Sequence, residues 1–156
     1  MVLGTRQIIY VGGLDKKYMP MKANEFMLGN FASVYPSMMP IKIAAIHKDK
    51  VAYRATTKKL EWVKMDLLRP IPITPEILEK NGFRKSVSPL GIHAKCYEID
   101  NKNKKYHLTI ANYNKYKRLL LNVDSEDSEC FNIKCDYVHQ LQQALNICRI
   151  KKEIEL

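Results

Sequence analysis

The segment from Asn101 to Val123 combines positive charge with aromatic rings and contains no acidic residue. Its cations are Lys102, Lys104, Lys105, Lys115, Lys117 and Arg118, and the rings between them belong to Tyr106, His107, Tyr113 and Tyr116. Cations that neutralise phosphates, beside rings that stack on bases, are what binding of single-stranded or looped nucleic acid requires. The segment therefore predicts a nucleic-acid contact, with RNA favoured, made by all of these residues except Tyr106. Alternation places Tyr106 in the core, and lysines that only solvate a hairpin are the alternative interpretation.

A second set of basic residues lies earlier in the chain. It comprises Lys42, Lys48, Lys50, Arg54, Lys58, Lys59, Lys64 and Arg69, opposed only by Asp49, Glu61 and Asp66, which leaves a net charge of +5. The whole chain has a formal charge of +10, which indicates an anionic partner but no particular fold. Two cationic segments predict a clamp on nucleic acid that is bound to another protein, with unrelated surface charge as the alternative.

Two further features are expected to be structural. Trp62, the only tryptophan, is predicted to pack in the core or in a hairpin rather than to serve as a base-stacking platform. The run from Asp124 to Glu129 holds four acidic residues and is predicted to be a solvated loop, with masking of the adjacent basic segment or mimicry of phosphates as the alternatives.

Catalysis is not expected, and no catalytic residue is assigned. The residues able to move protons near neutral pH are His47, His93, His107 and His139, with Glu98 and Asp136. They form no recognisable constellation, and the sequence lacks a phosphate-binding loop, a zinc-protease motif and a nucleophile elbow. A small RNA-cleaving enzyme using His107 and His139 is an alternative. Otherwise His139 is predicted to form hydrogen bonds at the junction of the helix with the sheet or of the two lobes.

The cysteines are predicted to be reduced and to act as small buried hydrophobes. No C-x-x-C pair occurs among the four cysteines, which are Cys96, Cys130, Cys135 and Cys148. Cys130 and Cys135 could bind a metal together with His139, but tetrahedral zinc needs a fourth ligand, so neither a metal site nor a cofactor is expected. No apolar run is long enough for a membrane span or a signal peptide, which predicts a cytoplasmic protein without a membrane partner.

Short strands with tight polar turns dominate the first part of the chain. They are predicted at Phe26 to Val34, Ile41 to Ile46, Val51 to Ala55 and Leu60 to Met65. Strands this brief favour a small SH3-like β-barrel over residues 21–69, because curling removes the exposed edges of an open sheet. Residues 1–20, with one strand-like stretch from Gln7 to Val11, are predicted to be an N-terminal extension.

A proline-rich connector leads to a second unit, residues 70–156, with an antiparallel sheet and two helices. Thr74, Pro75 and Glu76 predict a helix start, and Asn81 with Gly82 its end. Strands are predicted at 92–96, 106–110, 119–123 and 131–134, and a terminal strand at 150–156. A second helix is predicted over 136–148, with Tyr137, Val138, Leu141, Ala144, Leu145 and Cys148 on its apolar face and His139, Gln142, Gln143 and Asn146 on its polar face. The fold class is therefore α+β.

Three motifs carry a resemblance to a known group: MKANEFMLGN from Met21, PIPITPEILEKNGF from Pro70 and YVHQLQQAL from Tyr137. Their order and spacing resemble small, mostly uncharacterised proteins encoded by phages, prophages and other mobile elements of Bacteroidota. In that group the first motif usually stands at the N-terminus, so residues 1–20 are a departure, either an extension or an upstream start codon.

The resemblance supplies no catalytic residues, but it implies a mobile-element accessory protein in the cytoplasm of a bacterial host. Such proteins include inhibitors of host defences, anti-CRISPR proteins among them. Together with the charge pattern, it predicts a non-enzymatic protein that binds RNA or a nucleoprotein and blocks a host defence complex such as a CRISPR effector. A protein–protein adaptor or virion assembly component is the alternative.

Overall fold

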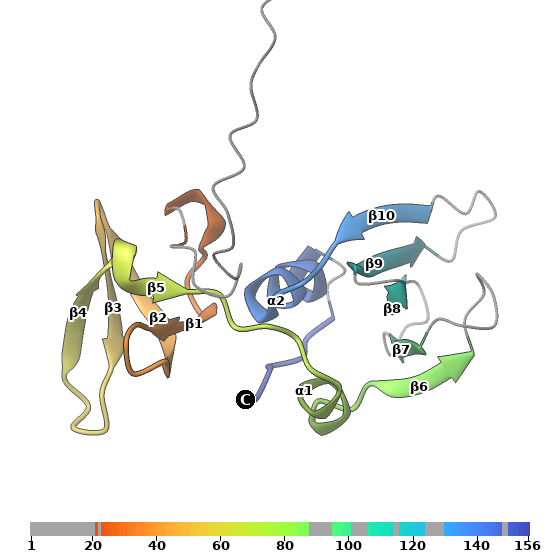
Figure 1. The fold of residues 1–156 in the computed structure, drawn as a ribbon, viewed down its shortest axis with the longest axis horizontal. Helices are drawn as coiled ribbons and strands as arrows, with labels where there is room; N and C mark the ends of the chain where they lie inside the picture. The colour runs from red at the N-terminus through yellow and green to blue at the C-terminus, as the bar shows by residue number, and fades with distance from the viewer. Residues whose placement is uncertain are drawn as a thin grey trace, which may run out of the picture.

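The computed structural model describes residues 21, 23–87, 95–100, 106–113, 116–123, 130–147 and 150–156. Two five-stranded antiparallel sheets lie on either side of a pair of helices (Figure 1). The strand order is β4-β3-β2-β1-β5 in the first sheet and β10-β9-β8-β7-β6 in the second. The predicted α+β class with antiparallel sheets is confirmed.

The first sheet is a meander of short strands. It comprises β1 (Phe31–Val34), β2 (Met39–His47), β3 (Lys50–Arg54), β4 (Leu60–Lys64) and β5 (Leu68–Arg69), with 3-10 turns at η2 (Ala23–Glu25) and η3 (Met65–Leu67). Its edges are β4 and β5, and no pairing among the described residues joins them, so the structure does not show the closed barrel that was predicted. A shift of register in β2 between Ile43 and Ala45 is a bulge-like irregularity, the kind of feature that bends a strand.

The core of the first sheet follows from the alternation of its strands. Ile41, Ile43 and Val51 are buried on one face together with Leu68, and Phe26 from the first motif packs into the same cluster. Gly29 has a φ of 84°, which an L side chain rarely adopts, and it ends the turn that carries Phe26 to β1. The buried Asn30 closes this turn, since its Oδ1 accepts a hydrogen bond from the backbone N–H of Met27 at 2.8 Å.

The second sheet is built from longer pairings. Its strands are β6 (Arg84–Val87), β7 (Lys95–Asp100), β8 (Tyr106–Tyr113), β9 (Tyr116–Val123) and β10 (Cys130–Lys134). The strands predicted at 106–110, 119–123 and 131–134 are confirmed, and the one predicted at 92–96 corresponds to β7, which begins at Lys95. Strand β6 was not predicted. The strand expected at Gln7 to Val11 and the loop from Asp124 to Glu129 lie outside the described residues.

Both predicted helices are present, as α1 (Pro75–Lys80) and α2 (Val138–Ile147). The Thr74 hydroxyl caps α1 by accepting a hydrogen bond from the Ile77 N–H at 3.3 Å, and Gly82 follows the helix with a φ of 77°. Gln140 reaches back to the start of α2, where its Oε1 accepts hydrogen bonds from the N–H groups of Asp136 and Tyr137. Local capping chemistry thus sets the helix ends.

The terminal strand predicted at 150–156 is wrong. These residues run without strand pairing, yet Ile150 and Ile154 are buried in the core of the second sheet. Asn81 holds the segment: its Nδ2 donates to the Glu155 carbonyl at 2.7 Å, and its Oδ1 accepts from the Glu155 N–H at 2.9 Å. The backbone of Glu155 therefore forms hydrogen bonds with the Asn81 side chain instead of with a neighbouring strand.

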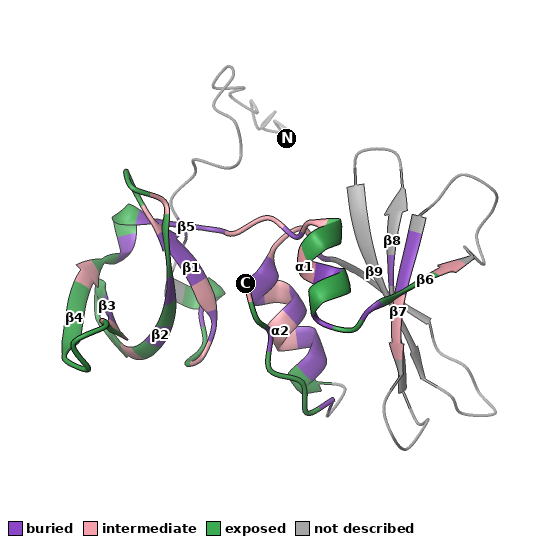
Figure 2. Cartoon of the chain, turned by 90° about the horizontal axis from the view of Figure 1, so that it is seen from below, coloured by how far each residue is buried: buried purple, intermediate pink, exposed green. Residues whose placement is uncertain are grey.

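Helix α2 is buried on two sides (Figure 2). Val138, Leu141 and Leu145 pack into the core of the second sheet, as predicted. The opposite face, predicted to be polar, lies against the first sheet. Phe31 of β1, a residue of the first sheet, packs against the core of the second sheet. His139 lies on this face of α2 and is only 2% exposed, so the face predicted to be polar is covered at this residue.

Candidate nucleic-acid interface

The outer face of β2, β3 and β4 carries exposed cations around an exposed tryptophan. In β3, Val51 and Tyr53 point toward the core cluster, so Lys50, Ala52 and Arg54 belong to the opposite face. The register then assigns the neighbouring strands, because residues paired side by side share a face. The outer face consists of Ala45, His47, Lys50, Ala52, Arg54, Leu60, Trp62 and Lys64.

Trp62 stands in the middle of this face. It is paired with Ala52, with Leu60 and Lys64 two residues away on the same strand. The indole is 51% exposed, so Trp62 does not pack in the core, and its place opposite Ala52 in the β3–β4 hairpin matches the other predicted location. The His47 ring meets it edge-on, with the ring centroids 6.3 Å apart and the planes at 83°.

The cations of the outer face surround this tryptophan. Lys50 is paired with Lys64, and Arg54 is paired with Leu60, so positive charge lies on both sides of the Ala52–Trp62 pair. All three cations are exposed, and among the residues that the structure describes no acidic side chain forms an ion pair with them. Their charge is therefore available to an external anion.

The nearest acidic residue of β4 lies on the other face. Glu61 is paired with Tyr53, whose hydroxyl donates a hydrogen bond to Glu61 Oε2 at 2.6 Å. This bond, reinforced by burial, raises the pKa of Tyr53 above its ordinary value. Glu61 is thus engaged away from Lys50, Arg54 and Lys64, and the outer face carries no carboxylate on β2, β3 or β4.

Two other members of the second basic set are engaged by contacts within the protein. Lys42 forms an ion pair with Glu153, whose pKa is lowered by that contact. Arg69 is buried, and its Nη1 donates to the carbonyls of Asp66 at 2.6 Å and Leu68 at 2.9 Å. The guanidinium also lies 5.1 Å from the centroid of the Tyr35 ring. Both cations are committed to the fold.

The segment predicted to bind nucleic acid, Asn101 to Val123, includes β8 and β9. Lys102, Lys104, Lys105 and Lys115 lie outside the described residues, whereas His107, Tyr113, Tyr116, Lys117 and Arg118 occupy positions in the two strands. Tyr113 is paired with Tyr116 at the end of the ladder, and Lys117 and Arg118 follow immediately. His107 is paired with Asn122, six residues from Tyr113 and hence about 20 Å along the strand. The register gathers four of the predicted residues at one end and leaves His107 at the other.

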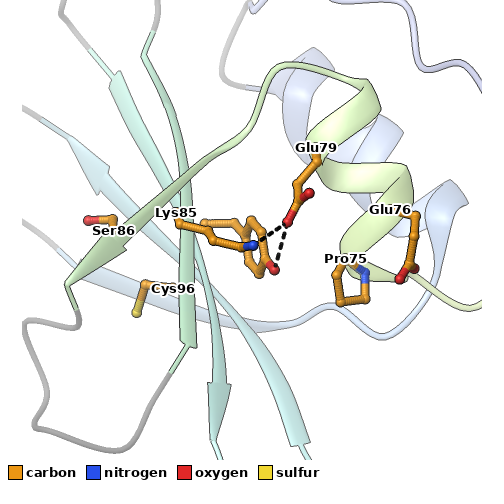
Figure 3. Close-up of a pocket in the computed structure, with 7 residues that line it drawn as sticks. Pro75, Glu76, Glu79, Lys85, Ser86 and Cys96 are labelled. Atoms are coloured by element: carbon orange, nitrogen blue, oxygen red, sulfur yellow. Dashed lines mark hydrogen bonds and ion pairs between the residues drawn. The ribbon is translucent and has the colours of Figure 1, made fainter.

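Another side-chain cluster with ionisable groups is a pocket of about 510 Å³ between α1 and the β6–β7 edge (Figure 3). Glu79 lies at its centre, 2.8 Å from Lys85 Nζ, and accepts a hydrogen bond from the Tyr97 hydroxyl at 3.5 Å. The contact with Glu79 raises the pKa of Lys85. The cation here is neutralised internally, which distinguishes the pocket from the outer face.

His139 lies at the junction between α2 and the first sheet, as expected, but not as a fully hydrogen-bonded residue. Its ring stacks on Tyr137 at 5.8 Å and lies 6.5 Å from Phe26, while Nδ1 is buried without a partner among the described residues. Burial lowers the pKa of His139 from 6.5 to about 4. A neutral imidazole inside the protein is the result.

The buried thiols described by the structure are Cys96 and Cys135. No group of three potential metal ligands occurs in the described ranges. Comparison of the chain with family models, with curated proteins and with solved structures finds no match. Neither α1 nor α2, nor any other helix of the described residues, has the length and apolar character to cross a membrane.

Proposed function

We propose that this protein binds RNA, alone or within a nucleoprotein, and acts without catalysis. The observation that carries the proposal is the outer face of β2, β3 and β4, where Lys50, Arg54 and Lys64 are exposed and form no ion pair with an acidic side chain of the described residues. Cations that neutralise phosphates supply most of the sequence-independent affinity for nucleic acid. The hairpin end at Tyr113, Tyr116, Lys117 and Arg118 would provide a second contact.

A salt titration tests this proposal. Binding of a labelled 20-nucleotide RNA should weaken linearly on a plot of log affinity against log salt, because neutralised phosphates release counterions. The triple variant K50A/R54A/K64A should reduce the slope by about 2, at about 0.7 for each phosphate contact on a single strand. The variant K80A/K151A/K152A loses the same charge from the second half of the chain and should retain the slope. Absence of RNA binding at low salt, or equal slopes in both variants, would overturn the proposal, and binding that ignores salt would favour an adaptor.

Inhibition of a host defence complex is a further part of the proposal, and it rests on the resemblance of the three motifs. Expression in bacteria that carry an active CRISPR effector should restore plaque formation by a targeted phage. The K50A/R54A/K64A variant should restore it less than the K80A/K151A/K152A variant. Equal protection by the effector with and without the protein would contradict this role.

We also propose that the first sheet has SH3-like topology. Support comes from five short antiparallel strands in the order β4-β3-β2-β1-β5 and from β2, which pairs with both β1 and β3 across its shift of register. Nuclear Overhauser contacts between β4 and β5 would demonstrate closure of the sheet, and their absence would establish an open one.

A further inference from the structure

We propose that Trp62 is a base-stacking platform, so that the ligand of the outer face is an unpaired single strand rather than a duplex. This inference rests on the proposed function and specifies the class of nucleic acid. The charge pattern alone does not distinguish a single strand from a duplex, because both present phosphates to the protein. The position of the indole supplies the distinction.

The geometry shows that the indole leans across the sheet. Trp62 belongs to β4 and His47 to β2, and these strands are separated by β3. Strands two places apart lie about 9 to 10 Å from each other, yet the two ring centroids are only 6.3 Å apart. The two side chains therefore reach toward each other over the outer face of β3.

The residue beneath this bridge is Ala52. It is fully buried although it belongs to the outer face, so larger neighbours must cover it, and Trp62 is its direct partner in register. Alanine at this position and at Ala45 leaves room for a flat ring on the sheet. An indole that rests on alanine and is 51% exposed presents much of its remaining surface to solvent.

The charged residues around Trp62 indicate which kind of ligand can bind over its ring. Lys50 and Lys64 lie on one side of the Ala52–Trp62 pair and Arg54 lies on the other, so an occupant of the ring has cations to both sides of it. An apolar peptide would leave these cations without partners, whereas a nucleotide strand places phosphates beside each base. The arrangement fits a polyanion that carries flat rings.

Only unpaired bases can use such a platform. In a duplex the base faces are already stacked on one another, and an external ring cannot reach them without unwinding. In a single strand the faces are free, and stacking on an aromatic side chain strengthens binding with little dependence on sequence. The outer face should therefore prefer single strands, loops or bulges.

The fluorescence of Trp62 reports on this site directly, because the chain has no other tryptophan. A single-stranded 12-nucleotide RNA should quench the emission, whereas the same strand annealed to its complement should quench it much less. Trp62→Leu should weaken binding of the single strand about 5- to 150-fold, the range for one stacked base. Trp62→Phe, which keeps a ring, should retain most of the affinity. Ile147→Ala alters another exposed apolar residue, on α2, and should change nothing.

The outcomes separate the two proposals. If the RNA binds with the expected salt dependence but Trp62→Leu binds as tightly as Trp62→Phe, or if duplex binds as tightly as single strand, the stacking platform is wrong and the proposed function stands. If no RNA binds at low salt, the proposed function fails and the platform fails with it. Circular dichroism of both variants shows whether a loss of binding arises from unfolding.

Discussion

Gln142 of α2 accepts a hydrogen bond from the backbone N–H of Phe31 in β1, with Oε1 and N 2.8 Å apart. The same side chain donates from Nε2 to the Gly29 carbonyl at 3.0 Å. Gln143 adds bonds from its Nε2 to Asn30 Oδ1 and to the Glu25 carbonyl, both at 3.1 Å. Residues from two of the three sequence motifs, MKANEFMLGN and YVHQLQQAL, therefore form the joint between the halves of the chain.

Replacement of this amide should loosen the joint. Gln142→Ala leaves the Phe31 N–H and the Gly29 carbonyl without their partner, and we expect it to lower the free energy of unfolding by about 1–3 kcal/mol. Chemical denaturation monitored by circular dichroism measures the change. The exposed Asn146, one turn further along α2, provides the control, and Asn146→Ala should stay within about 0.5 kcal/mol of the parent protein. Equal stability of the two variants would show that the amide does not hold the halves together.

The buried His139 should make stability depend on pH. Its pKa is about 4 in the folded protein against an ordinary 6.5, because burial disfavours the charged ring. Between these values the unfolded chain binds a proton that the folded chain does not, so the free energy of unfolding falls as pH decreases through this window. The contribution is fully present above pH 6.5 and amounts to about 3 kcal/mol in total.

Urea denaturation at pH 7.5 and at pH 4.5 measures this dependence. His139→Phe removes the titrating group and keeps a ring beside Tyr137 and Phe26, so its loss of stability between the two pH values should be about 2 to 3 kcal/mol smaller than that of the parent. His47 is exposed, and His47→Ala should retain the parent dependence. The same pH dependence in the parent and in His139→Phe would show that the histidine is not held neutral.

The segment near Glu155 should depend on Asn81. Asn81→Ala removes three hydrogen bonds of a buried amide, to Ile77 and to both backbone groups of Glu155, and we expect a loss of about 2–4 kcal/mol. Hydrogen exchange should show faster exchange of the Glu155 amide. Thr74→Ala at the other end of α1 removes a single cap and should cost about 1 kcal/mol without affecting that amide. Unchanged protection of Glu155 in Asn81→Ala would contradict the assigned role.

Local signals explain what the sequence could predict. The cap at Thr74, the stop at Gly82 and the alternation through β8 and β9 depend on residues close in the chain, and each prediction is confirmed. Alternation at Ile150 and Ile154 correctly indicated burial but not what covers them. Asn81, which bonds to the backbone of Glu155 in the same segment, lies 74 residues away in the chain, and no local pattern specifies this contact.

The candidate site was the harder prediction for the same reason. The identity of Trp62 suggests burial, because a large aromatic side chain usually packs inside. Its exposure depends on the register that pairs it with Ala52 and on β4 being the edge of the sheet. The helical pattern likewise placed His139 with the polar residues, since it could not show that the first sheet packs on that side of α2. Both features arise from contacts between segments, which composition and periodicity do not encode.

The hairpin of the second sheet can be tested against the outer face of the first. Tyr113 and Tyr116 are paired at the end of β8 and β9, and Lys117 and Arg118 follow in β9, so this end of the hairpin is the second contact proposed for RNA. The variant K117A/R118A should reduce the salt slope of RNA binding by about 1.4 if both cations contact phosphates. His107→Ala, at the far end of β8, changes no permanent charge and should leave the slope unaltered. If K117A/R118A keeps the salt slope of the parent protein, the interface is restricted to the first sheet, because cations that neutralise no phosphate release no counterions.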